Sequence, residues 1–232
     1  MKRTLAFVLI LCLMMTGTTF AFAEQPQMSA VYELYSVDGY YVDELGNAGS
    51  YSFHVPQIFD DSADAEAINA EIAERFGARA EDQFESMEGG FSLWIWNIEW
   101  ESYWYGTQLF LLVSSFDDGG FTDYAAYGYD FETRSRVTNE MILEQKGIGE
   151  EEYLENLREK VSLMFEDMFS RVPKDQWEAV GHDQLLEKTL GWLDLEQPMF
   201  LDRFGEIETI VKIASVAGAE WYYHLATPFA YG

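Results

Sequence analysis

The stretch that decides the fold is "WIWNIEWESYW", residues 94–104, which holds four tryptophans and two glutamates in eleven positions. Apolar residues recur there at every second position, the spacing of a β-strand whose side chains alternate between two faces. One face would carry Trp94, Trp96, Ile98, Trp100 and Trp104, and the other Ile95, Asn97, Glu99, Glu101 and Tyr103. We expect a helix to cover the tryptophan face, with Trp104 at the strand's end as the exception, because four bare indoles would expose about 800 Å².

The segments around this strand supply a helix and further strands. Residues 61–90 predict a helix that Asp61 or Ser62 caps and Gly89-Gly90 ends, with one apolar residue in every four, at Ile68, Ile72, Phe76, Ala80 and Phe84. Residues 107–116 form an almost wholly apolar run, typical of a central strand. The "DDGG" turn, Asp117 to Gly120, leads into a further strand over residues 121–131.

The two ends of the chain complete the pattern. Residues 29–46 predict a two-strand hairpin about Asp38-Gly39, and residues 51–56 a third short strand. A second long helix, within residues 137–173, ends before Pro173. A shorter helix is expected at 182–193, then strands at 205–215 and 219–227 around Ala217-Gly218. The stripe of the second long helix consists of Leu154, Leu157, Val161, Met164 and Met168. This order predicts an α+β fold, with largely antiparallel sheets and two long amphipathic helices packed on them.

Residues 1–23 have the features of a cleaved signal peptide, namely a basic start, a short apolar run and the small-residue pattern Ala21-Phe22-Ala23. We therefore expect a secreted or extracytoplasmic protein that does not insert in the membrane after cleavage. Cys12 is the only cysteine, so the mature chain would have no disulfide and no thiolate site. Loss of Lys2 and Arg3 leaves 12 basic residues against 41 acidic ones, a net charge of −29. Such a surface repels nucleic acid and favours cationic partners.

Glu99 and Glu101 are the one carboxylate pair with a spacing of chemical interest. On a strand their side chains lie about 7 Å apart, near the separation used in glycoside hydrolysis. A catalytic pair also needs one buried acid with a raised pKa, whereas alternate residues on a polar strand face are both solvated. We therefore favour a charged sheet surface. A hydrolase of wall polysaccharide using Glu99 and Glu101 remains the alternative.

No other motif assigns a reaction. His54, His182 and His224 lack metal-binding spacing, and we expect structural roles for them. The mature chain contains no nucleophile elbow, phosphate loop or dinucleotide fingerprint. The sequence therefore predicts no catalytic residue, no metal and no cofactor.

Two segments carry a resemblance to known families. The run "LFLLVSSFDDGGFTDYAAYGYDFETRSRVTNEMI", from Leu109 to Ile142, resembles the ectodomain family of the lysozyme-sensing anti-sigma factor RsiV. The run "YSFHVPQIFDDSADAEAINAEI", residues 51–72, is similar to the companion segment in the N-terminal region of the peptidoglycan deacetylase PdaC, where a helix carries an Ile-Asn pair, here Ile68-Asn69. The resemblance implies a PdaC-like segment at 24–104 and an RsiV-like segment at 105–232, with separate cores or as one compact unit.

The chain departs from the family pattern at two turns. Gly119-Gly120-Phe121-Thr122 stands where many relatives have Gly-Gly-Ala-His, and Thr133-Arg134-Ser135 stands where they often have Thr-Gly. The anti-sigma factor's sigma-binding segment and membrane span have no counterpart, so we do not expect the same signalling route.

The resemblance implies a non-catalytic envelope domain, and the family's known example binds lysozyme, a cationic protein. We expect either a cationic protein bound through Glu99, Glu101 and Tyr103, or a peptidoglycan-type glycan bound through Trp104 with Tyr103 and Tyr105. A structural domain without a small ligand is a further alternative.

Overall fold

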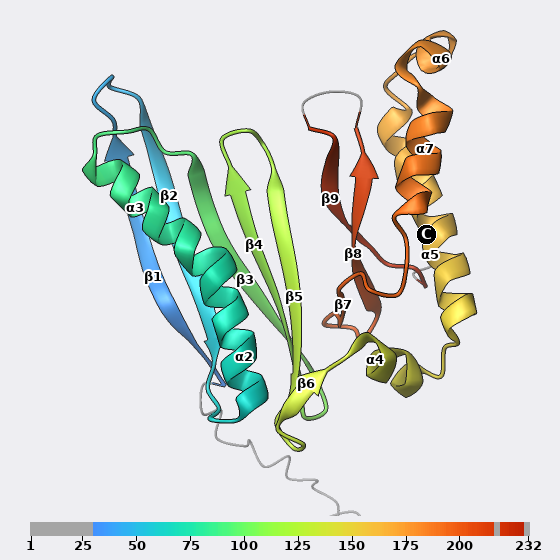
Figure 1. The fold of residues 1–232 in the computed structure, drawn as a ribbon, viewed down its shortest axis with the longest axis horizontal. Helices are drawn as coiled ribbons and strands as arrows, with labels where there is room; N and C mark the ends of the chain where they lie inside the picture. Colours follow the sequence, from blue (N-terminus) through green and yellow to red (C-terminus); the bar gives the residue numbers. More distant parts are fainter. Residues whose placement is uncertain (1–29, 216–218, 230–232) are drawn as a thin grey trace, which may run out of the picture. The chain divides into compact units, whose positions relative to one another are not determined.

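A six-stranded sheet is the larger of two sheets in the computed structural model, which describes residues 30–215 and 219–229. Its strands lie side by side in chain order (Figure 1): β1 (Val31–Val42), β2 (Ala48–Ile58), β3 (Ile95–Tyr105), β4 (Gln108–Asp117), β5 (Thr122–Asp130) and β6 (Ser135–Val137). All neighbours are antiparallel except β2 and β3, which run parallel because a helix connects them. The predicted α+β fold with largely antiparallel sheets is confirmed.

The predicted hairpin at Asp38-Gly39 is wrong, because β1 runs straight through these residues. The chain turns instead after Val42, where the carboxylate of Asp43 accepts hydrogen bonds from the backbone N–H groups of Leu45 and Asn47 at 2.9 and 2.8 Å. Gly39 lies opposite Tyr51, and a Cβ atom on Gly39 would stand 2.3 Å from that ring. Glycine is needed there for close approach and not for a turn.

One long helix connects β2 to β3 in the chain and crosses a face of this sheet (Figure 1). It consists of α2 (Ala63–Ile72), the π-helical turn η1 (Ala73–Gly77) and α3 (Ala78–Glu88). The predicted cap is confirmed, since Ser62 Oγ accepts from the Ala65 N–H at 3.2 Å, and so is the stop at Gly89. In a regular α-helix, residues four apart drift by about 40° around the axis. The wider π turn offsets this drift and keeps Phe76 and Ala80 buried like Ile68 and Ile72.

Asn69 fastens this helix to the end of β2. Its Oδ1 accepts from the Ile58 N–H at 2.7 Å, and its Nδ2 donates to the Ile58 carbonyl at 3.0 Å. The amide thus pairs with both backbone groups of one strand residue, as a neighbouring strand would. The buried Ile68 and the Asn69 contact with β2 explain the Ile68-Asn69 pair by its role in the fold.

The predicted burial of the tryptophan face is wrong for Trp94 and Trp96. The register of β3 against β4 shifts between Ile95 and Asn97, so Ile95 and Ile98 both enter the core. Trp94, Trp96 and Trp104 stay 38%, 43% and 50% exposed, and Trp104 is the exception that we expected. Trp100 alone packs partly against the core.

The C-terminal part contains four α-helices and a three-stranded sheet among the described residues: α4 (Asn139–Lys146), α5 (Glu150–Phe169), α6 (Trp177–Val180), α7 (His182–Gly191), β7 (Met199–Leu201), β8 (Ile207–Ala214) and β9 (Trp221–Ala226). The short 3-10 helix η2 (Lys174–Gln176) precedes α6. The single predicted long helix is two helices, because Gly147 adopts a left-handed φ of 67° and ends α4. The buried residues of α5 are Tyr153, Leu157, Val161, Phe165 and Phe169. Leu157 and Val161 belong to the predicted stripe as well, so the buried side lies next to the predicted side and overlaps it.

Strand β4 shows why its sequence is apolar throughout. Leu109, Leu111 and Val113 join the buried cluster under α2 and α3, whereas Phe110 and Leu112 join a second cluster with the C-terminal part. Both faces of β4 are therefore covered, as predicted for a central strand. Helices α5 and α7 lie on the far side of the second cluster, and each contacts β8. Tyr153 of α5 and Thr209 of β8 have their hydroxyl oxygens 2.8 Å apart. The Ala214 N–H of β8 donates to Thr189 Oγ1 of α7 at 3.0 Å.

The described residues from Val31 to Phe229 form one compact unit. The expected segment boundary after residue 104 falls at the end of β3, which pairs with β4. The signal peptide, Cys12 and the Ala217-Gly218 turn lie outside the described residues. In the part of the chain that the structure covers, no helix is both long enough and apolar enough to cross a membrane.

Candidate functional site

Strands β1, β2 and β3 leave one face of the six-stranded sheet accessible. Register places Asp38 opposite Ser52, Ser36 opposite His54 and Ser52 beside Asn97, and alternation continues this face to Glu99 and Glu101. Trp96 joins it through an edge-to-face contact with Phe116, the partner of Asn97. We call this surface the open face: Ser36, Asp38, Tyr40, Ser52, His54, Trp96, Asn97, Glu99 and Glu101.

His54 is held between two carboxylates at this face. Its Nδ1 lies 3.1 Å from Glu33 Oε1 and its Nε2 lies 3.3 Å from Asp38 Oδ1. The Trp100 indole N–H donates to the same Glu33 oxygen at 2.8 Å. The hydrogen bond with Glu33, followed by that with Asp38, raises the pKa of His54 although burial opposes it. Because both ring nitrogens are engaged, His54 serves as an electrostatic tie between β1 and β2 and not as a free base.

The structure places Glu99 and Glu101 in solvent, as predicted for alternate residues on a polar strand face. Glu101 Oε2 accepts a hydrogen bond from the Tyr103 hydroxyl at 2.7 Å. Neither glutamate lines the cavity between α5 and α7 or the two cavities beside β5. Among residues 30–215 and 219–229, no three histidines, aspartates or glutamates form a group that could hold a metal ion.

Glu101 also lies near carboxylates that sequence reasoning did not connect with it. The ring of Tyr103 stacks on Phe200 of β7, with centroids 5.7 Å apart and planes 15° from parallel. Burial, followed by the charges of Asp202 and Glu101, raises the pKa of Glu208. Asp202 and Glu208 stand about a hundred residues after Glu101, and only the stacking of β7 on β3 reveals their proximity.

Trp104 and Tyr105 point away from each other. Trp104 stacks on Phe131, with centroids 5.6 Å apart, on the helix side of the sheet. Tyr105 lies against the β7–β8 turn at Gly205, and Lys146 Nζ stands 4.7 Å from its ring centroid. Tyr103, Trp104 and Tyr105 therefore do not form one flat platform for a sugar chain.

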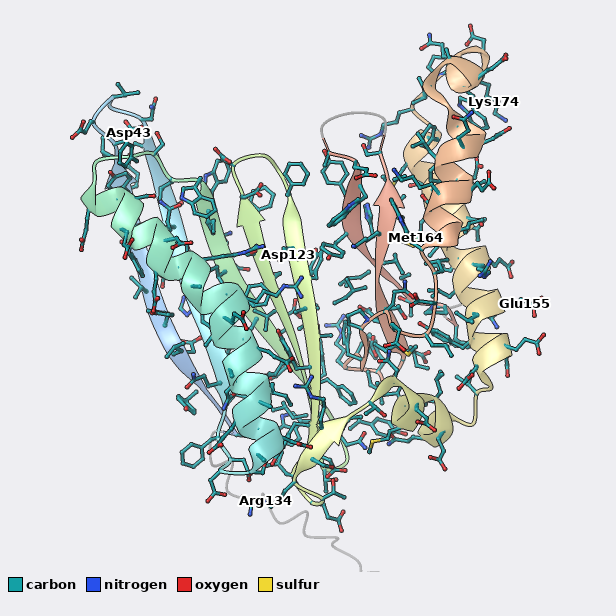
Figure 2. All side chains as sticks on the ribbon, in the orientation of Figure 1. Asp43, Asp123, Arg134, Glu155, Met164 and Lys174 are labelled. Atoms are coloured by element: carbon teal, nitrogen blue, oxygen red, sulfur yellow. The ribbon has the colours of Figure 1, made fainter. Side chains whose placement is uncertain are left out.

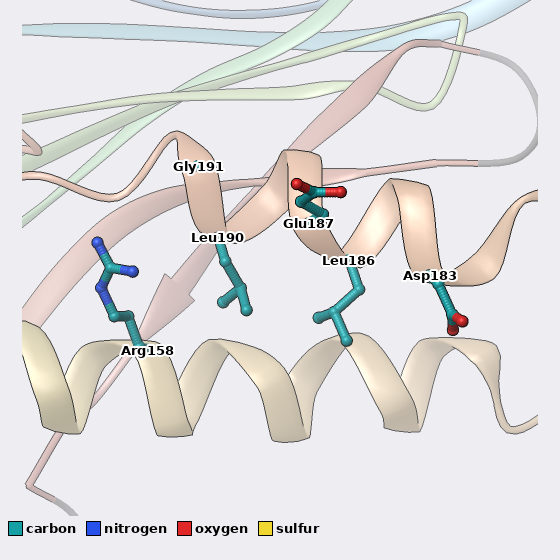
Figure 3. A pocket seen from close by; sticks show the side chains of 6 residues that line it. All are labelled: Arg158, Asp183, Leu186, Glu187, Leu190 and Gly191. Carbon is teal, nitrogen blue, oxygen red and sulfur yellow. The ribbon is translucent and has the colours of Figure 1, made fainter.

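A cavity of about 500 Å³ lies between α5 and α7. Leu186 and Leu190 point from α7 toward α5, with Arg158 at one end and Asp183 at the other (Figure 3), and Glu187 also lines the cavity. None of the residues predicted to bind a ligand lines it. It is an apolar gap between two packed helices with a charged rim.

No protein-family model matches the chain, and the comparison with curated proteins also found no match. The resemblance to the RsiV and PdaC segments therefore stays a prediction.

Proposed function

We propose that the protein is an exported, non-catalytic binding domain that engages a cationic protein, such as lysozyme, through its open face. The observation that supports this proposal is the exposure of Asp38, Glu99 and Glu101 on one uncovered surface of the sheet. Glu101 extends the negative charge toward Asp202 and Glu208. A basic partner would meet these carboxylates in a chain whose net charge is −27.

Aromatic side chains on the same face supply apolar contact area. Tyr40 is 70% exposed and Trp96 is 43% exposed. Tyrosine and tryptophan are enriched among the residues that dominate interface energetics, because they bury large area with little loss of conformational freedom. Carboxylates would then guide encounter and orientation, while the rings would slow dissociation.

The test is titration of the purified protein with hen lysozyme at low salt and at about 0.15 M salt, where the Debye length is about 8 Å. We expect binding at both salt concentrations. The double variant Glu99→Lys/Glu101→Lys should bind at least about tenfold more weakly, because it reverses charge within the contact.

The matched control is Glu151→Lys/Glu155→Lys on the exposed side of α5 (Glu155 is labelled in Figure 2), which changes the net charge by the same amount. Its affinity should stay within about twofold of the unchanged protein. Equal weakening by both pairs would show unspecific attraction, and loss of all binding at the higher salt would exclude the proposed contact.

A further inference from the structure

Two adjoining cavities line the outer edge of β5. They measure about 450 and 350 Å³ and share Arg75 and Tyr223. Strand β6 pairs only with Gly128–Asp130, so in the described part of the chain no strand pairs with residues 122–127 on that side. Both volumes fall within the range of small-molecule sites. We call this pair of cavities the β5 groove; it shares no residue with the open face.

Ion pairs hold the polar side of the β5 groove in place. Arg75 grips Asp123 with two nitrogens, Nε at 3.2 Å and Nη2 at 2.5 Å, and also donates to the Tyr124 carbonyl at 2.9 Å. Arg79 Nη2 lies 3.0 Å from the same aspartate, and its Nη1 donates to Ser115 Oγ at 2.6 Å. Figure 2 labels Asp123 beside β5. Arg79 keeps further N–H groups for a ligand, because a guanidinium has five donors.

The charge balance of the β5 groove differs from that of the whole chain. Its lining contains three basic and four acidic residues, whereas the chain contains 14 and 41. These lining residues are Arg75, Arg79, Lys212, Asp117, Asp123, Asp194 and Glu196. A nearly neutral groove with paired donors and acceptors does not select a ligand by net charge.

Aromatic rings form the other side of the β5 groove. Phe121 and Tyr222 stack with centroids 5.0 Å apart and planes 16° from parallel. Trp221 meets Tyr223 edge to face at 4.7 Å, and Lys212 Nζ stands 4.4 Å from the Trp221 ring centroid. The second cavity adds the rings of Tyr124 and Trp192. Flat apolar surfaces thus lie next to charged hydrogen-bonding groups.

We propose that the β5 groove binds a neutral oligosaccharide. A pyranose ring has apolar C–H faces that stack on aromatic rings and a rim of hydroxyl groups that both donate and accept. Such a hydroxyl group can accept a hydrogen bond from an arginine and donate one to a carboxylate at the same time, and it brings no charge. Two adjoining cavities with rings in each suit consecutive sugar units. An acidic sugar would meet Asp117, Asp194 and Glu196.

An extended peptide added to the edge of β5 is the competing occupant. Arg75 already occupies the Tyr124 carbonyl, which removes an acceptor that such a strand would use. The observations therefore favour the sugar.

The test is calorimetric titration of the purified protein with chitotetraose and with cellotetraose, together with tryptophan fluorescence. We expect saturable binding of at least one of them. Trp221→Ala should weaken binding at least about tenfold through loss of stacking. Arg79→Gln should weaken it through loss of hydrogen bonds. Phe204→Ala is the matched control, because this ring also lies under a cation, Arg203, yet is 73% exposed outside the β5 groove.

Thermal melting verifies that each variant is folded. If Arg79→Gln is unfolded, the affinity of Trp221→Ala alone tests the proposal, because Trp221 is partly exposed and its loss should not unfold the protein. The proposal is overturned if neither oligosaccharide binds in the millimolar range, if only polygalacturonate or peptide binds, or if Trp104→Ala weakens binding and Trp221→Ala does not. Failure of lysozyme binding at the open face would leave this inference untouched.

Discussion

Arg134 grips the carboxylate of Asp60 with two nitrogens, Nε at 3.2 Å and Nη2 at 2.9 Å, from a backbone with a φ of 54°. Arg134 also donates to Asp61. A positive φ is unfavourable for a residue with a Cβ atom. The ion pair offsets this strain and ties the turn after β5 to the residues that precede α2. Hydrogen bonding from Arg134 accordingly holds the pKa of Asp60 well below its usual range.

Substitutions of Arg134 should separate backbone strain from the ion pair. Arg134→Ala keeps the strained φ and loses both carboxylate contacts, so its melting temperature should fall by several degrees. Arg134→Gly also loses the contacts but relieves the strain, and it should melt a few degrees above the alanine variant. Calorimetry checks the order. Equal melting temperatures would mean that the backbone at this turn is not strained.

Asn69 offers a test of the contact between α2 and β2. Asn69→Ala leaves the N–H and carbonyl of Ile58 without their partners, which should lower the free energy of unfolding by about 1–3 kcal/mol. Asn69→Asp should also destabilise, because a carboxylate cannot donate to the carbonyl. Asn156→Ala is the control, since that partly exposed side chain donates to a carbonyl of its own helix. Urea unfolding of the three variants measures the difference, and a neutral Asn69→Ala would contradict the assigned role.

His54 should stabilise the fold at acid pH. Its folded pKa is raised above 6.5 by Glu33 and Asp38, so the folded state holds this proton more tightly than the unfolded state. The stabilisation is complete below about pH 6.5 and fades as the pH rises through the folded pKa. The stability gap between the unchanged protein and His54→Gln should therefore be larger at pH 5 than at pH 8 in urea titrations. A gap that grows with pH would refute this assignment.

His224 should act in the opposite direction. Burial lowers its pKa, and its Nε2 finds no hydrogen-bond partner among the residues that the structure describes. The folded state then binds this proton less readily than the unfolded state, so stability is lost as the pH falls below about 6.5. His224→Leu removes the titration and should gain stability relative to the unchanged protein from pH 7 to pH 5. Parallel pH profiles for the two proteins would show that His224 titrates alike in both states.

Prediction from the sequence was most accurate where one spacing of apolar residues held over a whole helix or strand. The apolar residues at every fourth position from Ile68 to Ala80 located the first helix and its buried side. The apolar run of β4 identified the central strand. The period failed at Ile95, where one bulge changed the face of the residues before it, so that Ile95 is buried and Trp94 and Trp96 are exposed. It failed also at Asp38-Gly39, because a glycine that permits a close tyrosine has the same sequence signature as a turn.

Contacts between distant segments account for most of what was missed in the sites. Glu33, Asp38, His54 and Trp100 meet only because β1, β2 and β3 are aligned by a register that alternation alone does not determine. Arg75, Asp123 and Trp221 come from three elements, and no local spacing links them. The closely spaced Glu99, Glu101, Tyr103, Trp104 and Tyr105 could be singled out from the sequence, but their neighbours could not.

The π turn η1 also has an evolutionary meaning, because such a turn corresponds to one residue inserted into an α-helix. The wider turn absorbs the rotation of about 100° that one extra residue adds in a regular α-helix. Ala80 therefore stays on the buried side and Arg79 stays in reach of Asp123, where a regular helix one residue shorter would also place them. A relative of this chain that lacks one residue of η1 should have a regular α-helix there and keep both contacts.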